Sequence, residues 1–172
     1  MSAMTVEHVL REYFAGEKSE ASLILLAGVL ALAAAIWLWF CVREPFARGL
    51  AASLLLTAAL GIGVGGSVYF RTDGQVRQLV EMQQREPARF AVEEGPRIRQ
   101  VVKSFGQYRI GYAIAIGMAL VFVFVVGKPL FHGLAVGLLI LAALGFTIDY
   151  YAEHRAVEYA RALEAAGAID VR

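Results

Sequence analysis

The feature that most constrains this chain is four long stretches without any aspartate, glutamate, lysine or arginine. They cover residues 21–42, 49–70, 110–127 and 129–148, and each is close to the roughly 20 residues that a helix needs to cross a bilayer core. Hydrophobic residues make up 59% of the 172 residues and charged residues 18%, against about 45–50% and about 25% in a soluble domain. The sequence therefore predicts an all-α membrane protein in which residues 1–172 form a single membrane domain with four transmembrane helices.

The lengths of the connections predict how these four helices pair. Only about six residues, 43–48 with Pro45 among them, separate the first two spans, and Gly127-Lys128-Pro129 joins the last two. Such short links favour antiparallel neighbours. We therefore expect two antiparallel hairpins, joined by the one long connection, residues 71–109.

The distribution of lysine and arginine predicts the orientation. Segments 1–20, 71–109 and 149–172 hold 13 of these residues, whereas the two short turns hold three. Basic residues are retained on the cytoplasmic side of a membrane. We expect a multi-pass protein of the bacterial inner membrane with both termini and the long connection in the cytoplasm.

These cytoplasmic segments have patterns typical of helices. Val6, Leu10 and Phe14 recur at helical spacing in a segment that otherwise carries charged residues, which predicts a short amphipathic helix. Breaks at Pro87 and at Gly95-Pro96 divide the long connection into two or three short helices, and the last segment continues the fourth span. The connection has a net charge of +3 and the two terminal segments together −4, which favours docking between them.

Composition excludes several classes of site. A single cysteine, Cys41, excludes an intramolecular disulfide and a four-thiolate metal centre. The net charge of +1 provides no basic footprint for nucleic acid. No spacing of histidines and carboxylates matches a metal or nucleophile motif, so we expect no catalytic residue, no metal and no cofactor.

Small residues at four-residue spacing mark expected helix contacts. Gly61 and Gly65 lie in the second span, and Gly133 and Gly137 in the fourth. Small residues allow the close backbone approach that drives helix association in lipid. The contacts could lie within one bundle or between copies in a homo-oligomer.

The candidate site lies at the cytoplasmic ends of the spans. Arg71 ends the second span, Arg109 precedes the third, and Asp149 follows the fourth, so all three have about the same depth. We predict that Asp149 contacts at least one of these arginines, directly or through one water. The cluster is either a structural clasp or an anionic site for a lipid headgroup or small substrate.

Three segments carry a resemblance to known proteins. Residues 68–75 (VYFRTDGQ), residues 97–105 before the third span, and residues 149–156 (DYYAEHRA) after the fourth resemble a group of bacterial four-span inner-membrane proteins with no assigned activity. The resemblance covers most of the chain and implies the fold but no function. The polar positions that it draws attention to are Arg71, Gln75, Arg97, Asp149 and Glu153.

The leading functional hypothesis is a non-enzymatic helical bundle in the lipid bilayer that binds a protein or lipid partner through its cytoplasmic face. The first alternative is a membrane-embedded enzyme that acts on an anionic, lipid-like substrate at this interface. The second alternative is a small oligomeric channel or carrier. The spans 21–42, 49–70 and 110–127 contain no ionisable acid, base or histidine, which argues against a proton or ion relay at the membrane midplane.

Overall fold

The computed structural model describes residues 3–169, and almost all of them are helical. Residues 1–2 and 170–172 of the predicted cytoplasmic segments lie outside the described residues. Within the described part, four continuous helices are long and apolar enough to cross a membrane. Short π-helical turns (η1–η3) interrupt or end three of them. The elements are α1 (Ala3–Trp37), η1 (Leu38–Val42), α2 (Pro45–Leu60), η2 (Gly61–Gly65), α3 (Gly66–Arg85), α4 (Pro87–Val121), η3 (Phe122–Val126) and α5 (Pro129–Ala165).

The two predicted short turns are the places where the chain reverses at one end of the molecule. Arg43 and Gly127 follow η1 and η3 with φ of 58° and 62°, a left-handed conformation that ends a helix. Pro45 and Pro129 then begin α2 and α5, because proline at a first helical position loses no hydrogen bond. The chain needs only two residues between helices at each turn.

The long connection differs from the expected series of short helices. Its first part belongs to α3 and its second part to α4, with one break at Glu86. Pro96 lies inside α4 without ending it. Proline clashes with the Cβ of the residue before it, and Gly95 has none, which removes one of the clashes that proline makes inside a helix. The N-terminal segment likewise belongs to α1, so these polar segments are not separate helices.

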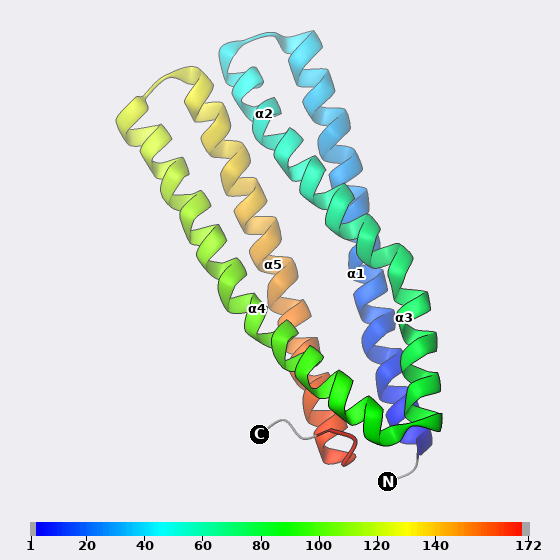
Figure 1. Cartoon of the computed structure of the whole chain (residues 1–172). Coiled ribbons are helices and arrows are strands. Elements are labelled where there is room, and N and C mark those ends of the chain that lie inside the picture. Colours follow the sequence, from blue (N-terminus) through cyan, green and yellow to red (C-terminus); the bar gives the residue numbers. More distant parts are fainter. Residues whose placement is uncertain (1–2, 170–172) are drawn as a thin grey trace.

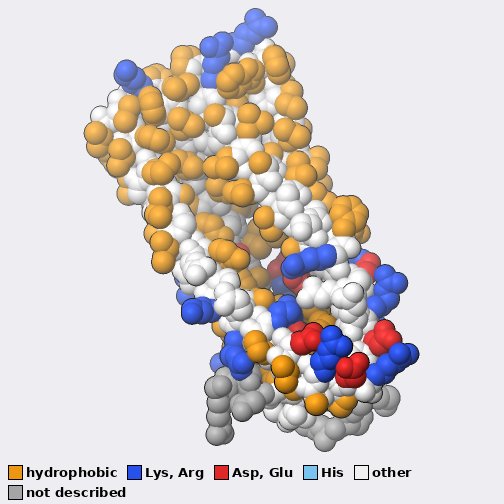
Figure 2. Space-filling view, in the orientation of Figure 1, with side chains coloured by type: hydrophobic (Ala, Val, Ile, Leu, Met, Phe, Trp, Pro, Cys, Tyr) orange, Lys and Arg blue, Asp and Glu red, His pale blue; other side chains and the backbone are white. Residues whose placement is uncertain are grey.

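The apolar parts of the helices lie side by side, with α2 between α1 and α5 and with α4 on the other side of α5 (Figure 1). In the described residues α4 makes no close backbone approach to α1 or α2. At the opposite end from the short turns, α1, α3, α4 and α5 converge, and the start of α1 and the end of α5 lie there (Figure 1). Figure 2 shows the acidic side chains of this face gathered at that end, which we call the polar end.

Glycines set the contacts between the apolar helix parts. A Cβ on Gly61 would lie 2.8 Å from the Cα of Gly28 in α1, and a Cβ on Gly133 would lie 2.0 Å from the carbonyl oxygen of Phe46 in α2. Gly65 and Gly137 are similarly close to α1 and to Ser53. The four glycines predicted as packing positions thus lie at helix contacts within this chain.

The polar end has a hydrophobic core of its own. Its side chains come from α1, α3, α4 and α5 and from the segment after α5, and the stacked rings of Tyr13 and Tyr159 have centroids 4.2 Å apart. Burial of this kind stabilises a fold only where water surrounds it. Among the described residues, the large apolar side chains that are at most 1% exposed are Leu10, Phe14, Phe90, Ile98 and Leu163.

Candidate functional site

The three residues of the predicted clasp do not contact one another. Arg71 pairs with Glu17 of α1 at 3.5 Å, and Arg109 pairs with Glu153 of α5. Asp149 instead accepts a hydrogen bond of 2.5 Å from the Tyr112 hydroxyl. The direct form of the predicted Asp149 contact with either arginine was therefore wrong, whereas a contact through one water stays a prediction.

The helix arrangement explains this outcome. In the described residues α3 and α5 make no close backbone approach, so Arg71 lies on a helix that does not adjoin Asp149. α4 does adjoin α5, but there Tyr112 faces Asp149, and Arg109 reaches Glu153 one turn further along. Similar depth at the membrane surface was therefore not sufficient to bring these side chains together.

Tyr112 fits against α5 because of a glycine. A Cβ on Gly145 would lie 2.5 Å from the Tyr112 ring, and Gly145 is one helical turn before Asp149. The ring therefore crosses α5 at Gly145 and places its hydroxyl on the carboxylate. Sequence reasoning missed Tyr112, although a glycine and an aspartate four residues apart share one helix face.

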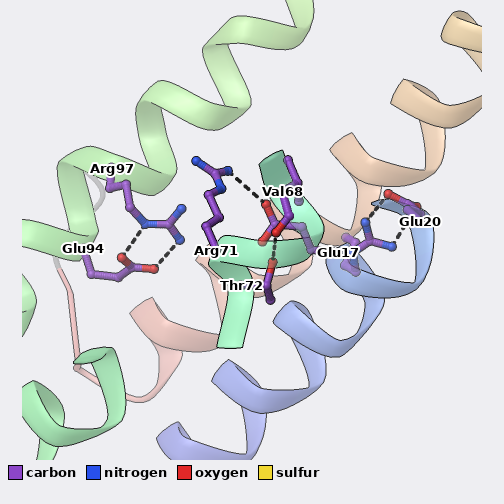
Figure 3. A network of polar contacts seen from close by, with 8 residues as sticks. Glu17, Glu20, Val68, Arg71, Thr72, Glu94 and Arg97 are labelled. Carbon is purple, nitrogen blue, oxygen red and sulfur yellow. Dashed lines mark hydrogen bonds and ion pairs between the residues drawn. The ribbon is translucent and has the colours of Figure 1, made fainter. Parts of the chain in front are cut away.

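The Glu94 carboxylate is buried at the polar end, where Arg97 and Tyr159 contact it. Arg97 donates two hydrogen bonds of 2.6 Å to the Glu94 carboxylate (Figure 3), and the Tyr159 hydroxyl donates a third of 2.8 Å. The Glu94 side chain is 0% exposed. Burial, followed by the charge of Glu94, raises the pKa of Tyr159, which keeps this phenol protonated as a donor.

Arg155 joins α5 to α1. Its guanidinium makes a two-pronged ion pair with Glu20, and a Cβ on Gly16 would lie 2.7 Å from the Arg155 Cδ atom. Gly16 thus leaves room for the arginine side chain to cross α1. Opposite charges predicted docking of the terminal segments on the long connection, and ion pairs of α1 with α3 and of α5 with α4 agree with it. The Arg155–Glu20 pair joins the two terminal segments to each other as well.

Glu17 is the least satisfied acid of the polar end. Its Oε1 atom faces Arg71 (Figure 3), but Oε2 is buried without a hydrogen-bond partner. Burial raises the pKa of this carboxyl, against the opposing effect of Arg71, Arg97 and Arg155. Burial likewise raises the pKa of the neighbouring Tyr13 to about 12.

The site as a whole consists of charge pairs at the places where the helices of the polar end meet. Arg71, Arg97 and Arg155 each contact a glutamate, and these contacts join α1 to α3 and α5 and fix a turn of α4. Gln75 lies partly exposed on α3 and takes no part in any of these contacts. Within residues 3–169 no group of three or more histidine, cysteine and acidic side chains could hold a metal ion.

Comparison with known proteins assigns no family to this arrangement. No protein-family model matches the chain, and no curated protein and no solved structure is significantly similar to it.

Proposed function

We propose that the protein is a non-enzymatic, multi-pass protein of the bacterial inner membrane that binds a protein or lipid partner through its polar end. The start of α1, the end of α5 and the α3–α4 turn lie at this end (Figure 1), and we place this end in the cytoplasm because of the lysine and arginine distribution. In this orientation the helices form two antiparallel hairpins, α1 with α2 and α4 with α5.

The observation that carries the proposal is the hydrophobic core of the polar end. All four continuous helices contribute to it, and the ion pairs Arg155–Glu20 and Arg71–Glu17 connect α1 to α5 and to α3 beside it. A packed platform outside the lipid, built by the same helices that cross it, is suited to hold a binding surface. Lipid anchorage alone does not require such a platform.

Position-specific cross-linking tests partner binding. Val92 is 73% exposed near the tip of α4, so a photo-reactive amino acid at this position should cross-link a partner in intact membranes. The matched control is the same probe at Lys128, in the turn at the other end. A probe at Val92 that gives no more cross-linked product than the probe at Lys128 would contradict a partner at the tip.

Reporter fusions test the orientation. A reporter active only after export should be inactive at the C-terminus and active at Pro45 or Lys128. The reverse pattern would place the polar end outside the cytoplasm and overturn the proposal.

A further inference from the structure

The groove between α1 and α3 is separate from the ion pairs of Arg71, Arg97 and Arg155, and it has no role in the site described above. Its volume is about 370 Å³, and it opens at the surface of the polar end. Three basic residues and one acidic residue line it, so its lining has a formal net charge of +2. They are Arg11, Lys18, Arg77 and Asp73.

Across the described part of the chain, two of the three basic residues of the groove form an ion pair with a carboxylate, and the third does not. Lys18 Nζ lies 2.7 Å from both carboxylate oxygens of Asp73, and Arg11 pairs with Glu7 on its own helix at 2.7 Å. Arg77 makes only a weak contact, from Nε to the Asp73 carbonyl oxygen at 3.4 Å. In the described residues its guanidinium has no carboxylate partner, so the groove retains one uncompensated positive charge.

The depth of the groove corresponds to the lipid headgroup layer. The Lys18 ammonium lies 5.0 Å from the ring centre of Tyr69, and the adjacent Phe70 is 79% exposed. Exposed aromatic residues beside basic residues are typical of the membrane interface. Arg77 lies seven residues beyond Phe70 on α3, about 10 Å along the helix, slightly more than the roughly 5–8 Å thickness of a headgroup layer. Side chains on a helix point back toward its N-terminus, and on α3 this direction leads from Arg77 toward the headgroups.

The floor of the groove is apolar. Phe14 is buried beneath it, and Val76 lies partly exposed beside it. A guanidinium and an ammonium above such a floor match an amphiphile that has an anionic phosphate next to a glycerol backbone. Arginine binds phosphate with paired hydrogen bonds, and lysine binds it as a point charge.

We propose that this groove binds the phosphate headgroup of an anionic phospholipid, with Arg77 as the principal contact and Lys18 as the second. The inference rests on the membrane orientation given in the proposed function and is independent of any protein partner. On binding, the phosphate competes with Asp73 for the Lys18 ammonium and takes up the free donors of Arg77.

Lipid retention by the full-length protein tests the proposal. The protein is exchanged into nanodiscs that contain equal amounts of phosphatidylglycerol and phosphatidylcholine, and the lipids that remain bound are measured by native mass spectrometry. We expect retention of phosphatidylglycerol over phosphatidylcholine. Arg77→Gln should lower this preference about five-fold, which is the effect of one basic residue at an anionic membrane surface.

Arg85→Gln is the matched control. Arg85 lies two turns further along α3, is exposed and pairs with Glu81, so its loss should leave the preference unchanged. Equal retention of both lipids by the wild type, or an equal loss of preference in both variants, would overturn the groove as the site. Displacement of the lipid by millimolar inorganic phosphate would show that a free anion is the ligand and would also overturn the proposal.

The melting temperature of each variant separates binding from folding. Arg77 is exposed and makes one weak contact, so its replacement should leave the melting temperature unchanged. Cross-linking at Val92 is measured independently, so a lipid preference without a cross-linked partner supports the groove and counts against a protein partner.

Discussion

Close backbone contact holds the apolar region together, whereas large side chains fill the polar end. A Cβ on Gly49 would lie 1.9 Å from the Leu130 carbonyl oxygen, so α2 and α5 meet there almost backbone to backbone. At the polar end, Phe14 and Phe90 instead lie between the helices, almost fully buried. In lipid, burying a large apolar side chain between helices gains no hydrophobic free energy, so close packing of the backbones must hold the helices together. In water the same burial is favourable. The same helices are therefore held together by close backbone contact in the apolar region and by buried side chains at the polar end.

The largest expected effect lies in the apolar region. Gly133→Leu places a side chain where even a Cβ would lie 2.0 Å from the Phe46 carbonyl oxygen. Neither backbone can yield locally, so α2 and α5 must separate. We expect loss of the folded bundle, measured as aggregation or a strongly lowered melting temperature in mild detergent.

Gly63→Leu is the control for this change. Gly63 lies in the continuous helix formed by α2, η2 and α3, and a Cβ there would meet nothing within 4 Å. This variant should remain folded. If Gly133→Leu were equally stable, close backbone contact would not be what holds the apolar region together.

The next effect concerns the polar end. Glu94→Gln removes the charge that balances Arg97 and should lower the free energy of unfolding by about 3 kcal/mol. This is the lower end of the range for breaking a buried ion pair, because the Arg97 side chain is 27% exposed. Glu93→Gln is the matched control, since Glu93 is exposed and pairs with Arg89 on the surface. Denaturant unfolding of both variants measures the difference, and equal midpoints would show that the buried pair contributes no more than a surface pair.

The sequence predicted the spans and turns better than the contacts of the site. The length of the charge-free stretches determines how many helices can cross a membrane, and Pro45, Pro87 and Pro129 begin helices where proline is tolerated. These features depend on local sequence alone. They required no knowledge of how the helices rotate against one another.

The contacts of the site depend on that rotation. Helical periodicity shows that Gly145 and Asp149 share a face, but not that this face meets Tyr112 of α4. Likewise Glu17 and Glu20 lie three residues apart, yet Glu17 contacts Arg71 of α3 and Glu20 contacts Arg155 of α5. Glu17 therefore faces α3 and Glu20 faces α5, and only the packing of α1 between these two helices determines which acid contacts which helix.

A smaller effect tests the boundary between the two regions. Tyr112→Phe removes the donor to Asp149 and should lower the free energy of unfolding by about 1–2 kcal/mol, because hydrogen bonds to charged groups are stronger than neutral ones. Tyr108→Phe, one turn earlier on α4 and half exposed, should have no measurable effect. Thermal unfolding in detergent compares the two variants, and a similar loss in both would show that the Asp149 contact contributes nothing.

The same contact predicts an order for two acids on α5. Asp149→Asn should destabilise more than Glu153→Gln, because the partner of Glu153, Arg109, is 53% exposed and ion pairs that solvent reaches contribute only about 0–1 kcal/mol. Melting temperatures of the two variants measure this order. The reverse order would place the stronger interaction at Arg109.

The smallest effect should be a gain in stability, at Glu17. Burial raises the pKa of this carboxyl above its ordinary value of 4.5, so the folded protein binds this proton more tightly than the unfolded chain does. Stability therefore falls as the pH rises from about 4.5 through the raised pKa, and the loss of stability persists at higher pH.

Glu17→Gln imitates the protonated form and supplies an N–H₂ donor, so it should raise the melting temperature at pH 8. The gain should vanish toward pH 4, where the wild-type carboxyl is protonated in both states. Glu12→Gln, an exposed change on the same helix, should show no comparable pH-dependent gain. A lower melting temperature for Glu17→Gln at pH 8 would mean that attraction to Arg71, Arg97 and Arg155 outweighs burial and that the charged pairs themselves hold α1 in the polar end.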